Sequence, residues 1–154
     1  MELVKQWICE LIKGELDMKP QIIEDFSALE ASAYKSQYFR KALEGTEYVL
    51  CLVSAAEYLG LCSWTTEPMI YVFSKEDCLR EGIEIASKKG LWYTTVNQTI
   101  NDLLSDPEVD EQVILESLAD QYYRDQYASL TIRPENQDAF QHFRPMAEHY
   151  YRTD

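Results

Sequence analysis

Apolar residues recur at helical spacing through the first 45 residues. In residues 3–12 they recur at i, i+1, i+4, i+5, i+8 and i+9, which predicts an amphipathic helix that ends at Gly14. A second helix is expected to begin at Pro20, a residue suited to the first helical position. Its apolar positions are Ile22, Phe26, Leu29 and Ala33. A third, short helix is expected to end near Gly45 and to carry Tyr38, Phe39, Ala42 and Leu43.

The middle of the chain alternates between the two periodicities. Residues 48–53 are continuously apolar and predict a buried strand. Ser54 is placed to cap a short helix over residues 55–59, with Gly60 at its C-terminal side. Residues 69–73 are uncharged, β-branched and aromatic, and they predict the clearest strand. Shorter strands are expected at 83–86 and 91–95, joined by a turn at 88–90.

Helices are predicted again toward the C-terminus. Thr95 and Gln98 match a capping box, and Ile100, Leu103 and Leu104 form the buried side of the helix that follows. Asp106 and Pro107 predict the start of a helix that runs to about residue 126, with a buried stripe of Ile114, Leu118 and Tyr122. Asn136 is expected to cap a last helix carrying Ala139, Phe140 and Phe143, which Pro145 should break or kink.

These elements predict one α+β domain over residues 1–154, with a small mixed sheet flanked by helices and with helical N-terminal and C-terminal segments. Three parts are distinguished: a helical segment over 1–45, an α+β module over 46–126 and a C-terminal segment over 127–154.

Charge narrows the possible partners. The 154 residues include 14 Lys and Arg against 27 Asp and Glu, a formal charge of −13. Such a chain does not coat DNA phosphates or anionic lipid, but it can bind basic proteins. Residues 1–12 carry charges unlike a signal peptide, and no apolar stretch approaches a membrane span, so a cytoplasmic protein is expected. The four cysteines form no CxxC pair and are expected to be reduced.

The sequence contains no recognisable catalytic or cofactor motif. GxGxxG, GxxxxGK and GxSxG are all absent. His142 and His149 are seven residues apart, whereas a zinc pair on one helix face prefers a spacing of four. We therefore expect no enzymatic activity, no cofactor and no metal site.

The acidic run 102–126 is the strongest candidate for a binding site. It holds eight acidic residues and one basic residue, a net charge of −7. One interpretation is a solvated helix face with acids near two helix N-termini. The other is a surface that docks on a basic partner, with Glu116 and Asp120 on the helix face away from Leu118. The candidate binding residues are Asp110, Glu111, Glu116 and Asp120, with Tyr122, Tyr123 and Tyr127 as aromatic anchors.

A small basic segment offers an alternative. Lys35, Arg40 and Lys41 lie in a stretch without acids, and predicted helices followed by a strand suggest a degenerate helix-turn-helix over residues 20–45. A second strand or glycine turn that could form a wing is missing. Three positive charges also stand against the −13 of the chain, so direct nucleic-acid binding is not expected.

The order of several short motifs resembles the AbiE-type antitoxins of type IV toxin–antitoxin systems. The residues are Ser-Ala-Ala-Glu-Tyr-Leu-Gly-Leu at 54–61, Pro68 before the strand 69–73, and a Thr-Thr segment at 94–95 that leads to Asp-Leu-Leu at 102–104. The resemblance covers residues 46–120 and corresponds to the module that follows the family's winged helix. It implies neutralisation of a nucleotidyltransferase-like toxin by protein binding, with no catalytic residue. It also implies structural roles for Ser54 and Gly60.

The sequence thus predicts an acidic binding protein that neutralises or regulates a basic partner in a toxin–antitoxin or phage-defence system. The alternative within the binding class is a phage-encoded nucleic-acid mimic that inhibits a defence nuclease, as anti-CRISPR proteins do. The further alternative is a transcription regulator that uses the degenerate helix-turn-helix.

Overall fold

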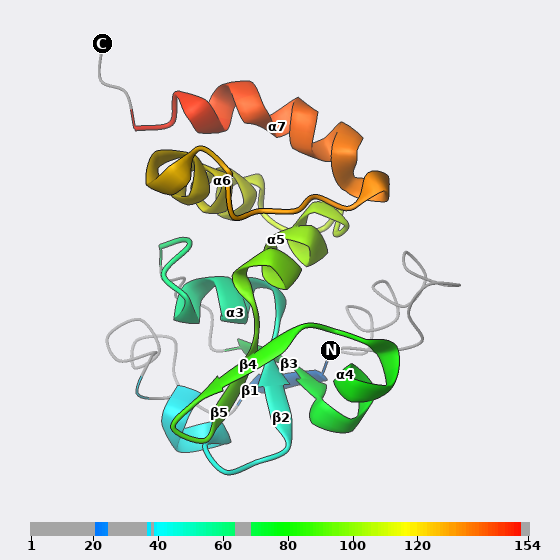
Figure 1. The fold of residues 1–154 in the computed structure, drawn as a ribbon. Helices are drawn as coiled ribbons and strands as arrows, with labels where there is room; N and C mark the ends of the chain where they lie inside the picture. Colours follow the sequence, from blue (N-terminus) through cyan, green and yellow to red (C-terminus); the bar gives the residue numbers. More distant parts are fainter. Residues whose placement is uncertain (1–20, 25–36, 38, 64–68, 152–154) are drawn as a thin grey trace.

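The fold is α+β, with a five-stranded mixed sheet and helices packed against it, as the sequence predicts (Figure 1). The computed structural model describes residues 21–24, 37, 39–63 and 69–151. The strands are β1 (Gln21–Glu24), β2 (Tyr48–Leu50), β3 (Met69–Ser74), β4 (Ile85–Lys88) and β5 (Leu91–Thr94).

The strands lie in the order β1-β3-β2-β5-β4. β3 is antiparallel to both β1 and β2, and β4 is antiparallel to β5. β2 and β5 are parallel, with Val49 opposite Trp92. A parallel pair needs a long crossover, and here the crossover contains α3, β3, α4 and β4.

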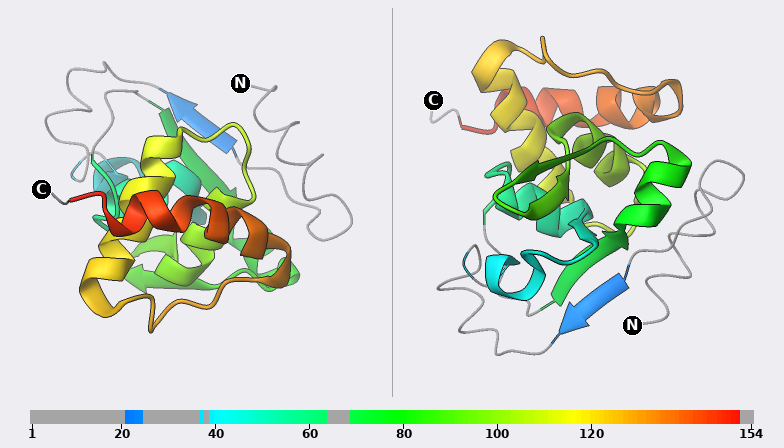
Figure 2. Two further views of the ribbon diagram at one scale, coloured as in Figure 1. Left: turned by 90° about the horizontal axis from the view of Figure 1, so that it is seen from above. Right: turned by 60° about the horizontal axis from the view of Figure 1, so that its bottom comes forward.

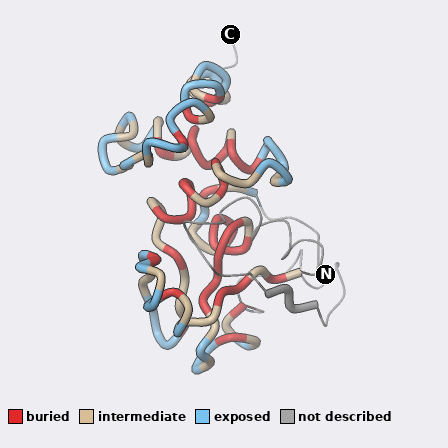
Figure 3. Tube along the Cα trace, turned by 90° about the vertical axis from the view of Figure 1, so that its right-hand side faces the viewer, coloured by how far each residue is buried: buried red, intermediate tan, exposed pale blue. Residues whose placement is uncertain are grey.

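The helices form a second layer that extends away from the sheet. They are α3 (Leu52–Tyr58), α4 (Lys75–Glu81), α5 (Val96–Leu104), α6 (Glu111–Asp125) and α7 (Gln137–Glu148), with a 3-10 turn, η1 (Pro134–Asn136), before α7. α5 connects the sheet to α6 and α7, which lie against one another at the far side of the molecule (Figures 1 and 2). α7 is outermost, and much of its outer surface is exposed (Figure 3). No helix in the described parts of the chain is long and apolar enough to span a membrane.

Alternation along the central strands divides the core between the two faces of the sheet. Leu50, Ile70 and Val72 belong to one apolar cluster, together with Phe39 from the helical residues 39–43. Their neighbours along the strands, Val49 and Phe73, belong to the other cluster, which continues into α5, α6 and α7. Successive side chains of a strand point to opposite faces, so these short strands are covered on both sides.

The structure contradicts the second predicted helix. Residues 21–24 form β1, in which Ile22 pairs with Tyr71 of β3. The strand is stabilised by main-chain hydrogen bonds to a segment almost fifty residues away, and such a partner is invisible to local periodicity. The predicted helix-turn-helix over residues 20–45 therefore does not begin with a helix at residues 21–24. The predicted helix at 3–12 and residues 25–36 lie outside the described residues.

The junction after β2 also differs from the prediction. The buried strand expected at 48–53 ends at Leu50, and α3 begins at Leu52 with a φ of +51°. Ser54 lies within α3 instead of capping it, and its Oγ accepts a hydrogen bond from the backbone N–H of Tyr71 at 2.9 Å. The serine therefore ties α3 to β3. Gly60 ends this region with a φ of +75°, as expected for a left-handed residue after a helix.

Three helices after β3 differ from the prediction. The polar stretch after β3 is the helix α4, capped by the Ser74 hydroxyl, which accepts from the N–H of Asp77. α6 begins at Glu111 with Asp110 as its cap, because the Asp106 carboxylate closes a turn by accepting from the N–H of Glu108. Pro145 lies inside α7 and does not break it.

Only one of the two hydrogen bonds of the predicted capping box forms at the start of α5. The Thr95 hydroxyl accepts from the N–H of Gln98 at 3.2 Å, as in a capping box. The side-chain Oε1 of Gln98, however, accepts from the N–H of Glu84 and from the guanidinium of Arg133. Gln98 thus ties α5 to the segments before β4 and before η1, and the second half of the box is absent. Ile100, Leu103 and Leu104 are buried as predicted.

Candidate protein-binding surface

One side of α6 carries three of the seven residues predicted to bind a partner, Glu116, Asp120 and Tyr123. The opposite side is apolar, with Ile114 and Leu118 buried in the core. Gln112, Glu116 and Asp120 follow one another at intervals of four, so they lie along one stripe of the helix. Tyr123 continues this stripe one turn further. The environment of each residue decides whether a partner can reach it.

Glu116 is not an exposed docking residue, contrary to the prediction. It is only 6% exposed, and its carboxylate accepts from the N–H of Ser63 at 2.7 Å. The same carboxylate also accepts from Gln112 at 2.6 Å and from the Tyr150 hydroxyl at 3.1 Å. Burial by itself raises the pKa of Glu116, but these hydrogen bonds outweigh it and lower the pKa below its usual value. The carboxylate therefore joins the loop after α3 to α6 and to the end of the chain.

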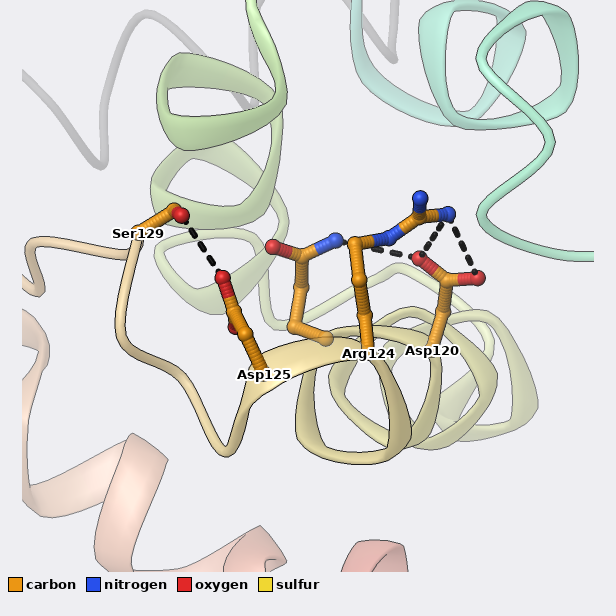
Figure 4. Close-up of polar contacts among 5 residues, drawn as sticks. Asp120, Arg124, Asp125 and Ser129 are labelled. Atoms are coloured by element: carbon orange, nitrogen blue, oxygen red, sulfur yellow. Dashed lines mark hydrogen bonds and ion pairs between the residues drawn. The ribbon is translucent and has the colours of Figure 1, made fainter.

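Asp120 is half-buried and already engaged (Figure 4). Its carboxylate accepts from Arg124, one turn further along α6, at 3.3 and 3.4 Å, and from Gln121 at 3.0 Å. In the same view Asp125 accepts from the Ser129 hydroxyl at 2.6 Å, which fixes the turn after α6. The Arg124 side chain is 64% exposed, so its ion pair with Asp120 is open to solvent.

The tyrosines predicted as anchors lie together but differ in access. Tyr123 is 47% exposed, whereas Tyr122 and Tyr127 are half-buried. The ring of Tyr122 contacts both of the others, with centroid distances of 5.2 Å to Tyr123 and 5.4 Å to Tyr127. The Tyr123 hydroxyl donates to the backbone carbonyl of Glu148 at 2.8 Å. Tyr123 is thus held by α7 while one side of its ring faces solvent.

Tyr127 belongs to an internal arrangement that holds an arginine. The guanidinium of Arg144 lies 5.4 Å from the ring centroids of both Tyr127 and Phe140. Arg144 also donates to Glu148 at 2.7 Å, and the Tyr127 hydroxyl donates to the same carboxylate at 3.1 Å. The hydrogen bond from Arg144 lowers the pKa of Glu148, and burial next to that carboxylate raises the pKa of Tyr127. Tyr127 is therefore a structural residue.

Sequence reasoning missed the exposed Tyr151 beside Tyr123. Tyr151 is 57% exposed, and its ring lies 5.6 Å from that of Tyr123 and 5.1 Å from that of Tyr150. We call Tyr122, Tyr123, Tyr150 and Tyr151 the tyrosine face. Two of the four exposed large apolar side chains in the described part of the chain belong to it. The C-terminal tyrosines gave no local signal, because the contacts that group them with α6 are long-range.

A separate group of exposed acids lies on the two segments next to the contact between the end of α5 and η1. The Ser105 hydroxyl donates to the Asn136 side chain at 2.8 Å, and Asn136 donates to Asn101 at 3.0 Å, which brings η1 against the end of α5. The exposed acids of these two segments form what we call the acidic end: Glu108, Asp110, Glu111, Glu135 and Asp138. Asp110 and Glu111, both predicted as binding residues, belong to it.

Each arginine in the described part of the chain donates to an acceptor of the same chain. These arginines are Arg40, Arg80, Arg124, Arg133 and Arg144. Around the acidic end the only basic side chain in the segments 105–111 and 133–138 is Arg133, which donates to Gln98. None of the five exposed carboxylates forms an ion pair with a described basic side chain.

Two acids of the predicted acidic run do not contribute to this surface. Burial raises the pKa of Asp102 to about 7, and the Oδ2 atom of this side chain is enclosed without a hydrogen-bond partner. Burial also raises the pKa of Asp106 to about 6. The thiols of Cys51 and Cys78 are buried near Asp102, and burial raises the pKa of Cys78 to about 12. Cys62 is also a free thiol, and Cys9 lies outside the described residues.

The basic candidates and the histidines form no comparable site. Arg40 is committed to Glu44 at 3.4 Å and to the Tyr58 hydroxyl at 3.2 Å, Lys41 is exposed, and Lys35 lies outside the described residues. His142 packs its ring on Phe143, and His149 Nδ1 lies 2.8 Å from the carbonyl of Pro145. Within the described ranges, no three His, Cys, Asp or Glu side chains are grouped as metal ligands.

Comparisons with protein-family models, with curated proteins and with solved structures found no match for this chain. The resemblance to the AbiE-type antitoxins therefore stays a prediction, and the function is argued from the surface itself.

Proposed function

We propose that this protein acts by binding, and that its α6–α7 layer occupies a basic surface of a partner protein. The observation that carries the proposal is the acidic end, five exposed carboxylates on two segments that the Ser105–Asn136 hydrogen bond links, none of them in an ion pair with a described basic side chain. A basic partner supplies the opposite charge that these carboxylates lack. The tyrosine face, carried by α6 and the residues after α7, adds exposed aromatic area of the kind enriched in interfaces.

The motif resemblance adds a class of partner to this proposal. In this proposal the antitoxin-like module covers a positively charged site of the toxin that normally receives nucleic acid or a nucleotide. The phage-inhibitor alternative requires the same acidic surface and a defence nuclease as partner. The identity of the bound protein separates the two: a nucleotidyltransferase-like protein identifies an antitoxin, and a nuclease identifies an inhibitor.

Affinity capture from the native host tests the proposal, with tagged protein, moderate salt and a parallel sample treated with nuclease. The expected result is one basic protein in stoichiometric amount, recovered with and without nuclease. Recovery of nucleic acid alone, lost after nuclease treatment, would overturn the proposal and favour a nucleic-acid-binding role.

Charge reversal then locates the interface. Glu108→Lys with Glu135→Lys changes two exposed acids of the acidic end and should slow association and weaken affinity roughly tenfold at low salt. The matched control is Glu47→Lys with Glu76→Lys, an equal change of charge on exposed acids beside the sheet. Equal loss in both pairs would mean that only net charge matters and that the acidic end is no docking site.

A further inference from the structure

The Arg144 arrangement shows how this protein holds a guanidinium. Two aromatic rings, Tyr127 and Phe140, lie 5.4 Å from the guanidinium carbon, and the Glu148 carboxylate accepts its Nε–H at 2.7 Å. The face of an aromatic ring attracts a cation, and a carboxylate beside it fixes the orientation. This site is filled by a side chain of the chain itself.

A second pair of rings lies beside the first set and is open to solvent, with the half-buried carboxylate of Asp120 nearby. The rings of Tyr123 and Tyr151 are 5.6 Å apart, 47% and 57% exposed, and no described cation lies over either ring. Asp120 precedes Tyr123 by one turn of α6. Burial raises the pKa of Tyr151, and the nearby carboxylates of Glu116 and Asp120 raise it further. Both sets thus combine aromatic rings with a carboxylate, but in the second set Arg124 pairs with Asp120 and no described cation lies over the rings.

We propose that the rings of Tyr123 and Tyr151, with the Asp120 carboxylate beside them, bind an arginine side chain of the basic partner. This inference rests on the proposed function and names the contact through which the partner is recognised. The charge of the site indicates its occupant. Two exposed rings beside the Asp120 carboxylate attract a planar cation, whereas an apolar segment would offer this carboxylate no hydrogen bond or opposite charge. Arginine matches the geometry because its guanidinium can stack on a ring and bond to a carboxylate at the same time.

The proposal predicts that loss of Arg124 strengthens binding of the partner's arginine. It occupies Asp120 now, at 3.3 and 3.4 Å, with its side chain 64% exposed (Figure 4). An incoming arginine must displace it from the carboxylate. Removing this arginine from an already acidic protein should therefore strengthen binding of the partner's arginine, by about twofold to fivefold given the small strength of an exposed ion pair.

The test uses a fluorescein-labelled peptide of glycine and serine with three arginines, and the same peptide with citrulline, the neutral isostere of arginine. Binding to the full chain is followed by fluorescence anisotropy at low salt. We expect the arginine peptide to bind and the citrulline peptide to bind at least tenfold more weakly. Tyr151→Leu, which keeps an apolar side chain but removes the ring, should weaken binding about threefold to tenfold. Tyr151→Phe should restore it, and Arg124→Gln should tighten it.

Leu79→Ala is the matched control, because Leu79 is an exposed apolar residue of α4, far along the chain from this surface. Equal binding of the citrulline peptide, full binding by Tyr151→Leu, or weaker binding by Arg124→Gln would each overturn the proposal. So would a Tyr151→Leu variant that instead dissociates a dimer in sedimentation, since the face would then be a contact between two copies.

The arginine site and the proposed function fail in different ways. If Glu108→Lys with Glu135→Lys abolishes capture of the host protein while Tyr151→Leu does not, the function stands and the arginine site falls. If Tyr151→Leu loses the peptide while the charge reversals leave capture unchanged, the arginine site stands and the acidic end is no docking site.

Discussion

Replacement of Asp102 by Asn should remove a pH-dependent loss of stability. The Asp102 Oδ2 atom is enclosed without a partner, while Oδ1 accepts from Gln98 at 2.9 Å. Burial is the main cause of the raised pKa, which the neighbouring Arg133 only partly offsets. A folded-state pKa above the ordinary value favours the protonated acid in the native protein. Its contribution to stability is therefore complete below about pH 4 and is lost as the pH rises through 7.

The magnitude follows from the two pKa values. A difference between 3.8 and about 7 corresponds to about 4 kcal/mol of unfolding free energy, lost between these two pH values. Asn cannot ionise, and its Oδ1 can still accept from Gln98. The gap in stability between Asp102→Asn and the wild-type protein should therefore widen in favour of the variant by about 1 to 2 kcal/mol from pH 6 to pH 8.

Urea unfolding followed by circular dichroism at pH 5, 6, 7 and 8 measures this gap. Other titrating groups are common to both proteins, so their contributions cancel in the difference. Asp110→Asn is the control, because Asp110 is an exposed N-cap and Asn caps a helix equally well, which should leave stability within about 0.5 kcal/mol. A gap between Asp102→Asn and wild type that stays constant from pH 5 to pH 8 would refute the assignment of a buried, protonated Asp102.

Three further outcomes are expected. Glu116→Ala should lower the unfolding free energy by about 1 to 3 kcal/mol, because Ser63, Gln112 and Tyr150 all lose the buried carboxylate that accepts from them. A thermal melt checks this, and an unchanged melt would mean that water replaces the carboxylate. Ser54→Ala should cost about 1 kcal/mol, since the N–H of Tyr71 loses the serine oxygen, whereas Ser54→Thr should lose less. Cys78, buried and with a pKa of about 12, should resist a thiol reagent at pH 8 until urea unfolds the chain, as peptide mapping by mass spectrometry can show.

Local patterns predicted the elements whose own residues carry a clear strand or capping signal. The uncharged, β-branched run became β3, the two short strands around Gly90 became β4 and β5, and Thr95 caps α5. α4 was missed although its signals were present, with Ser74 as cap, acids in the first turn and Gly82 in a left-handed conformation after the last turn. That helix could have been predicted by reading the caps instead of the polarity.

The errors have a common physical cause in long-range pairing. β1 begins a segment, residues 22–33, whose apolar residues have helical spacing, yet the main chain of β1 pairs with β3. Glu116 lies on the polar side of a helical wheel, yet Ser63 and Tyr150, from distant segments, enclose its carboxylate. Sequence periodicity describes one element at a time. It therefore located the candidate acids and tyrosines on α6, but it could not separate those that face solvent from those that join elements.

The place of β2 in the sheet has a consequence for synthesis of the chain. β2 has β3 on one side and β5 on the other, so its second edge is paired only after residue 94 has left the ribosome. The apolar face that carries Val49 and Phe73 is covered later still, once α5 and α6 have been synthesised. A nascent chain that stops near residue 90 thus presents an open strand edge beside an uncovered apolar face, the combination that leads to aggregation. Chains truncated in this region should be insoluble when expressed, and the shortest useful truncation has to retain α6.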